Sequence, residues 1–192
     1  MPIKHINRKG DIYFLHESTT KTGKPKWFFS KKAEGNLAEV VPAGYEIYEN
    51  HNAQVFLRVI VPMLVTKSDI ETVEEGVRKH AKLRFFLVEA KGESIIVFVA
   101  NQNTDFLEGA VASRFGITDR EKFASTMQGN LTYMPMMRFS LVEEKTRRFF
   151  VERWCFRGSI DDWFPLTGTG DLSKMVKKYA PHLGKESFYE LM

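Results

Sequence analysis

The sequence predicts an α+β fold, in which a small β-rich N-terminal module packs on an antiparallel sheet with helices on one face. Segments in which apolar and polar residues alternate come in neighbouring pairs joined by short turns, which is typical of antiparallel hairpins. Helix-capping patterns follow only after Pro62, where the character of the chain changes. We therefore expect a basic β-rich module over residues 1–62 and an α+β body over residues 63–192.

The body is organised around a long apolar hairpin at residues 131–157. Its first strand carries apolar residues at odd positions, namely Leu131, Tyr133, Met137, Phe139 and Leu141. Glu144 and Lys145 mark the turn, and aromatic residues such as Phe150 and Trp154 favour a second strand after it. Pro135 has no N–H to donate, so it predicts a bulge or a free edge near the start of the hairpin.

The N-terminal module is expected to contain a hairpin over residues 11–32, because Gly23 and Pro25 form a strong turn signal. Two further strands are predicted at residues 45–48 and 54–61, joined by an asparagine-containing turn. Such a short module is poor in core residues and is expected to lean on the rest of the chain.

Capping patterns predict the helices of the body. Ser68 with Glu71 matches a capping box, which would start a helix after residue 62. Two more helices are predicted between residues 103 and 129, and Asp171 is expected to cap a last helix. Residues 159–163 follow Gly158 and contain Asp161 and Asp162, a pattern that predicts a turn or a short helix.

Composition points to a cytoplasmic protein. The single cysteine among 192 residues excludes an internal disulfide and fits a reducing compartment. No apolar run approaches the roughly 18 residues of a membrane helix, and the first ten residues lack the apolar core of a signal peptide. We therefore expect no membrane association. The sequence does not specify an oligomeric state.

The net charge of +4 is unevenly distributed, since residues 1–32 alone carry eight Lys or Arg and two acidic residues, a net charge of +6. This basic head predicts an anionic partner, either nucleic acid or an acidic protein surface. The predicted binding residues are Lys21, Lys24, Lys26, Trp27, Lys31 and Lys32, with Trp27 available for stacking. The alternative is that these lysines serve solubility alone.

One short motif suggests catalysis. Glu89-Ala-Lys91, at the end of a predicted strand, is similar to the E-x-K of restriction-type metal-dependent nucleases, which implies a metal-binding carboxylate and a lysine that polarises water. Such a site needs a second acid from a neighbouring strand. The same spacing recurs at the turn from Glu143 to Lys145, so charged turn residues also explain it. We expect a non-catalytic protein without metal or cofactor, and a protein–protein interaction module remains a further alternative.

A resemblance covers about the first third of the chain. The stretch 44–50 reads GYEIYEN, and the stretch 55–58 reads VFLR. With the preceding Gly23-Lys24-Pro25 and Trp27–Ser30, these motifs resemble an N-terminal module of uncharacterised bacterial proteins. The resemblance implies no activity, so it assigns no functional residue.

Overall fold

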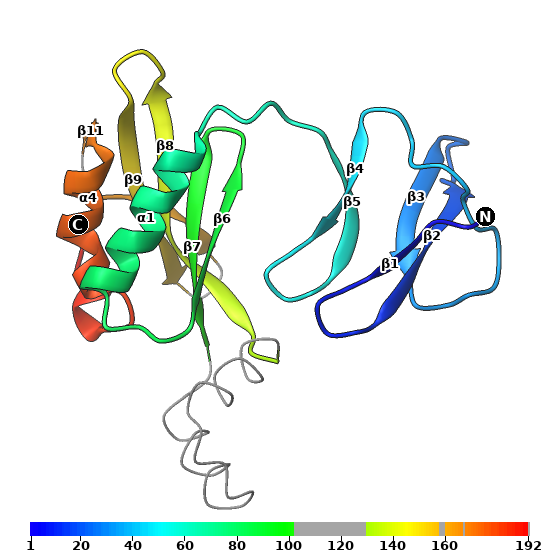
Figure 1. The fold of residues 1–192 in the computed structure, drawn as a ribbon, viewed down its shortest axis with the longest axis horizontal. Helices are drawn as coiled ribbons and strands as arrows, with labels where there is room; N and C mark the ends of the chain where they lie inside the picture. The colour runs from blue at the N-terminus through cyan, green and yellow to red at the C-terminus, as the bar shows by residue number, and fades with distance from the viewer. Residues whose placement is uncertain (102–129, 158–159, 167, 192) are drawn as a thin grey trace, which may run out of the picture. The chain divides into compact units, whose positions relative to one another are not determined.

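The computed structural model describes residues 1–101, 130–157, 160–166 and 168–191, and Figure 1 shows the path of the chain. It contains two compact units. The N-terminal unit holds residues 1–60, and the second unit holds residues 61–101 and 132–191. The helices predicted between residues 103 and 129 lie outside the described residues.

The N-terminal unit is built from two small antiparallel sheets. Its strands are β1 (Lys4–Ile6), β2 (Ile12–Thr19), β3 (Pro25–Ser30), β4 (Tyr45–Glu49) and β5 (Val55–Val59). The first sheet has the order β1-β2-β3, and β4 pairs with β5 in the second. The sequence predicted both hairpins but not β1, which is only three residues long. Gly23 has a φ of 78° in the β2–β3 turn, a conformation that glycine adopts without steric cost.

The second unit contains one antiparallel sheet, as predicted. Its strands are β6 (Phe86–Lys91), β7 (Ser94–Ala100), β8 (Tyr133–Glu143), β9 (Arg148–Arg157), β10 (Ile160–Pro165) and β11 (Gly170–Asp171). The order is β10-β9-β8-β7-β6, and β11 also pairs with β9. The predicted central hairpin is therefore confirmed as β8–β9. The register shifts where Phe98 pairs with Pro135, which confirms the bulge that this proline predicted.

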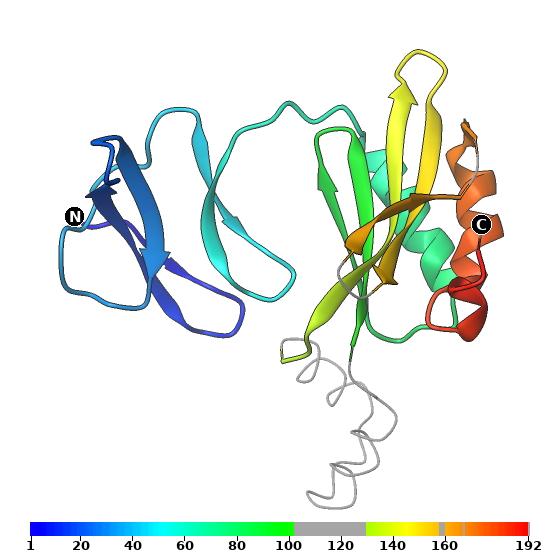
Figure 2. The same ribbon diagram turned by 180° about the vertical axis from the view of Figure 1, so that it is seen from behind.

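Among the described residues, two helices cover one face of this sheet, and both lie on the same side of it in Figures 1 and 2. They are α1 (Lys67–His80) and α4 (Leu172–Tyr179), followed by the short 3-10 turns η1 (Ala180–His182) and η2 (Glu186–Phe188). Val73 of α1 and Val176 of α4 belong to the same buried core as Val97 and Phe139 of the sheet. The α+β class is confirmed. None of the described helices is long and apolar enough to cross a membrane.

Two predictions about local structure were wrong. The capping box of α1 is formed by Thr66 and Asp69, two residues before the predicted pair Ser68 and Glu71. Residues 160–165 form the edge strand β10 rather than a turn or a short helix, because they pair with β9 residue by residue from Arg157 to Glu152. Asp161 and Asp162 are therefore exposed residues of a strand and cap no helix.

Asp171 caps α4 as predicted, and its carboxylate makes stability depend on pH. Its Oδ1 accepts hydrogen bonds from the Ser173 hydroxyl at 2.7 Å and from the Lys174 backbone N–H at 3.0 Å. These two donors lower the pKa of Asp171 below the usual aspartate value. Because the folded pKa is the lower one, the stabilisation is present above the unfolded-state pKa and is lost as the pH falls through the folded pKa. We expect Asp171→Ala to lower the free energy of unfolding by about 1 kcal/mol at neutral pH.

Urea unfolding at several pH values checks this prediction. The difference between wild type and Asp171→Ala should shrink below about pH 4, where the aspartate becomes protonated. Asp171→Asn is the control, since asparagine caps a helix about as well but does not titrate in this range. An acid-induced loss of stability as large in Asp171→Asn as in the wild type would contradict the assignment.

Candidate basic hairpin site

The β2–β3 hairpin ends in a tight turn that fixes the tip of the predicted binding site. The backbone N–H of Thr20 donates to the carbonyl of Lys24 at 2.8 Å, and the N–H of Gly23 donates to the carbonyl of Thr20 at 2.9 Å. The Thr20 hydroxyl also accepts a hydrogen bond from the N–H of Lys24 at 3.1 Å. Every residue from 17 to 26 is exposed. The turn therefore presents the side chains of Lys21 and Lys24 to solvent on a defined backbone.

The alternation of β3 separates two of the predicted binding residues. Lys26 lies 5.6 Å from the ring centroid of Phe28, which in turn stacks on His16 at 5.2 Å. Trp27 points to the other face, where its ring lies 6.4 Å from that of Tyr45 and is half-buried. The side chains of Trp27 and Lys26 therefore lie on opposite faces of β3. The exposed aromatic ring on the lysine face is Phe28, which is 40% exposed.

Not all of the basic residues are available for a partner. Lys31 forms a 2.9 Å ion pair with Asp11 and lies over the Tyr13 ring, which is on the Trp27 face. This hydrogen-bonded pair lowers the pKa of Asp11 and raises that of Lys31. Arg8 is likewise paired with Glu49. By contrast, four of the predicted lysines form no ion pair within the described residues, and these are Lys21, Lys24, Lys26 and Lys32.

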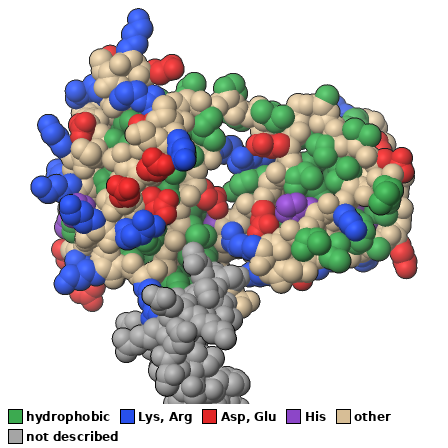
Figure 3. All heavy atoms as spheres, in the orientation of Figure 1, with side chains coloured by type: hydrophobic (Ala, Val, Ile, Leu, Met, Phe, Trp, Pro, Cys, Tyr) green, Lys and Arg blue, Asp and Glu red, His purple; other side chains and the backbone are tan. Residues whose placement is uncertain are grey.

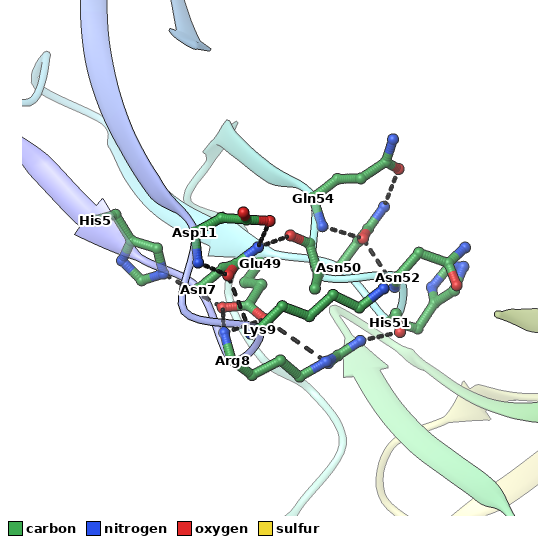
Figure 4. Close-up of polar contacts among 11 residues, drawn as sticks. His5, Asn7, Arg8, Lys9, Asp11, Glu49, Asn50, His51, Asn52 and Gln54 are labelled. Carbon is green, nitrogen blue, oxygen red and sulfur yellow. Dashed lines mark hydrogen bonds and ion pairs between the residues drawn. The ribbon is translucent and has the colours of Figure 1, made fainter. Parts of the chain in front are cut away.

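A polar cluster joins the β1–β2 turn to the β4–β5 hairpin and so holds β2 in place (Figure 4). Its centre is Asn7, which is only 4% exposed. The Asn7 side-chain amide donates to the carbonyl of Ala53 at 2.7 Å, while its Oδ1 accepts from the backbone N–H groups of Lys9 and Asp11 at 3.0 and 2.8 Å. Beside it, the Arg8 guanidinium donates to the carbonyl of His51. These hydrogen bonds join the two sheets of this unit, whose apolar core is small.

Comparison with protein-family models, with curated proteins and with solved structures finds no match to this chain. The resemblance to a module of uncharacterised bacterial proteins therefore stays a prediction.

The alternative candidates Glu89 and Lys91 lie in the second unit, on the sheet face opposite the helices. Along one row of the sheet, Glu89 of β6 is separated from Glu152 of β9 by one residue each of β7 and β8. Three strand spacings of roughly 4.8 Å place the two backbones roughly 14 Å apart, which is too far for a shared metal ion. The residue in between on β8 is Arg138, which forms an ion pair with Glu152 at 2.6 Å. Across the described residues, no three His, Cys, Asp or Glu side chains are grouped to hold a metal.

Lys26 and Phe28 lie on one face of β3, and Lys21 and Lys24 lie in the adjoining turn. We call these four residues the basic hairpin site. Trp27 and Lys31 lie on the other face, and Lys32 follows the strand with its carbonyl 3.0 Å from Nε2 of His16. Sequence reasoning missed Phe28. The period of two along β3 was enough to place Phe28 on the same face as Lys26. Nothing in the local sequence showed which face of the strand is exposed to solvent.

Proposed function

We propose that this protein is a non-catalytic binding protein that contacts an anionic partner, nucleic acid in the first place, through the basic hairpin site. The observation that carries the proposal is the composition of the hairpin tip. Residues 18–26 contain three lysines and four Ser or Thr hydroxyls without an acidic residue, and all of them are exposed. Lysine and hydroxyl side chains are among the groups that bind nucleic-acid phosphates.

The exposed ring of Phe28 favours a single-stranded over a double-stranded nucleic acid as the partner. Its exposed ring lies on the same face as Lys26 and stacks on His16, so a base that stacked on its open side would leave its phosphate near a lysine. Stacking on aromatic rings beside a cationic track is the general mode of binding to single strands. A cytoplasmic location belongs to the same proposal, since Cys155 is a free thiol.

Fluorescence anisotropy of labelled single- and double-stranded oligonucleotides, titrated with the full chain at several salt concentrations, tests the proposal. We expect the logarithm of the affinity for single strands to fall linearly with the logarithm of the salt concentration. Replacing Lys21, Lys24 and Lys26 together with glutamine should weaken binding at moderate salt about tenfold and reduce the magnitude of the slope by about 2, because three phosphate contacts are removed.

A second basic surface offers the matched control. Lysine and arginine side chains gather along the edge of the second unit that contains α4 (Figure 3). Glutamine at the exposed Lys174, Lys177 and Lys178 changes the net charge by the same amount and should leave the slope unchanged. Phe28→Ala should weaken single-strand binding only. The proposal fails if both triple variants act alike, and cleavage of the oligonucleotides with Mg²⁺ would favour Glu89 and Lys91 instead.

A further inference from the structure

The second unit has a pocket of about 370 Å³ beside the β6–β7 turn. Its lining residues are Val61, Lys91, Gly92, Glu93, Ser94, Ile96 and Arg138. Ile96 pairs with Arg138 across β7 and β8, while the neighbouring Ile95 is fully buried in the core beneath the helices. Successive side chains of a strand point to opposite faces, so the pocket lies on the sheet face that α1 and α4 do not cover.

Arg138 is held in one orientation by two contacts that leave most of its donors unused. Its Nε donates to Oε2 of Glu152 at 2.6 Å, and its guanidinium carbon lies 4.5 Å from the ring centroid of Trp163. The Arg138 and Glu152 side chains are 27% and 13% exposed, so both are partly shielded from bulk water. Its two terminal nitrogens form no hydrogen bond within the described part of the chain. A guanidinium fixed in this way is preorganised to bind an oxyanion through its terminal N–H groups.

Further polar groups surround the same space. Lys91 and Ser94 face each other across the turn as a register pair, and the Ser94 hydroxyl lies 3.1 Å from that of Ser140. Neither Lys91 nor Glu93 forms an ion pair among the described residues. The turn that lines one side of the pocket is held in place by hydrogen bonds. The carbonyl of Gly92 accepts them from the N–H groups of Leu64 and Val65 at 2.9 and 3.2 Å.

We propose that this pocket binds a small phosphate-bearing ligand, with Arg138, Lys91 and Ser94 holding the phosphate. Arg138, Lys91 and Ser94 line the same pocket and supply guanidinium, ammonium and hydroxyl donors. Charge-assisted hydrogen bonds from such donors are typical of phosphate sites. Glu93 accepts a hydrogen bond from a hydroxyl or amino group of the same ligand. Ile96 and Val61 provide the apolar contact. The volume is at the lower end of the range for small-molecule sites, so the ligand is of metabolite size.

Amide chemical shifts in the full chain, measured during titration with glycerol 3-phosphate, test this proposal. We expect saturable shifts centred on Gly92, Glu93 and Ser94. Lys91→Gln should weaken binding about tenfold, because one charge-assisted hydrogen bond is lost. Arg138→Lys should have a similar effect, since it keeps the charge but not the planar fork. The same spectra report whether each variant remains folded.

The controls separate this site from other causes. Lys145→Gln, in the β8–β9 turn, makes the same charge change at an exposed position and should leave binding unchanged. Glyceric acid at equal ionic strength replaces the phosphate with a carboxylate and should bind at least tenfold more weakly. Equal binding of glyceric acid would overturn the phosphate assignment. Shifts scattered over surface lysines, or shifts that Lys91→Gln does not weaken, would overturn the site.

This inference does not depend on the basic hairpin site, which lies in the other unit. Glutamine at Lys21, Lys24 and Lys26 is expected to leave the glycerol 3-phosphate titration unchanged, whereas it should weaken oligonucleotide binding. A loss of both by this variant would show that the pocket is not an independent site.

Discussion

Replacing Asn7 with alanine is expected to lower the stability of the N-terminal unit by about 3 kcal/mol, because one buried carbonyl and two partly buried N–H groups lose their partner at once. The carbonyl of Ala53 would lose the Asn7 amide, and the N–H groups of Lys9 and Asp11 would lose its Oδ1. Ala53 is only 2% exposed, so water cannot easily replace the amide at this carbonyl. The apolar core of this unit is small, which makes such a loss a large fraction of its stability.

Amide hydrogen exchange measures this effect where it occurs. Protection should fall in β1, β2, β4 and β5 of Asn7→Ala, while the amides of β7 and β8 in the second unit keep theirs. Asn36→Ala is the matched control, because Asn36 is exposed and donates one long hydrogen bond to the carbonyl of Glu17 at 3.3 Å. Exchange rates that change no more in Asn7→Ala than in Asn36→Ala would show that the polar cluster of Figure 4 does not hold the unit together.

The hairpins were predictable because their signal is local. Alternation and turn residues lie within a few positions of each other, and so β2–β3, β4–β5 and β8–β9 are all visible in the sequence. The local sequence does not show which face of each strand is covered by other parts of the chain. Trp27 and Phe28 are neighbours of similar character, and Trp27 lies on the face that meets Tyr45, a residue of β4 that is distant in the sequence. The sequence therefore indicates which lysines lie in this hairpin, but not which aromatic side chain shares a face with Lys26.

The two local errors have the same origin. Thr66 with Asp69 and Ser68 with Glu71 both match a capping box, and the choice between them depends on a residue far along the chain. Arg147 donates to Asp69 and to the carbonyl of Leu64, which stabilises the earlier start. Likewise, β10 is a strand because it pairs with β9, where Trp163 lies beside Trp154 with ring centroids 5.0 Å apart. Cross-strand packing of this kind outweighs intrinsic preference.

The pocket beside the β6–β7 turn shows a third limit of sequence reasoning. Lys91 was noticed for its spacing from Glu89, which suggested a metal site. In the structure, Lys91 lines a pocket with Arg138, a residue of a different hairpin about fifty positions away in the sequence. Glu89 does not line that pocket. A constellation assembled from separate hairpins leaves no fixed spacing, so it can be found only once the strand order is known.

Replacing Gly76 with valine is expected to lower the free energy of unfolding of the second unit by about 3 kcal/mol, because α1 and α4 pack too closely at this point for any side chain. A Cβ atom at Gly76 would overlap with Cγ1 of Val176, which is 1% exposed and cannot move aside without disturbing the core. In an exposed helix the same glycine would be unfavourable, and alanine would gain up to about 1 kcal/mol. Whether a substitution of Gly76 lowers or raises the free energy of unfolding therefore reports whether the two helices are in contact.

Urea unfolding of a double-mutant cycle tests the contact directly. Gly76→Ala alone and Val176→Ala alone should each destabilise the unit, the first by overlap and the second by a cavity. Combined, they should cost clearly less than their sum, because the smaller side chain at position 176 makes room for the new methyl group. Additive effects would mean that Gly76 and Val176 do not touch in solution. A more stable Gly76→Ala variant would show that α1 is not closely covered by α4 at this position.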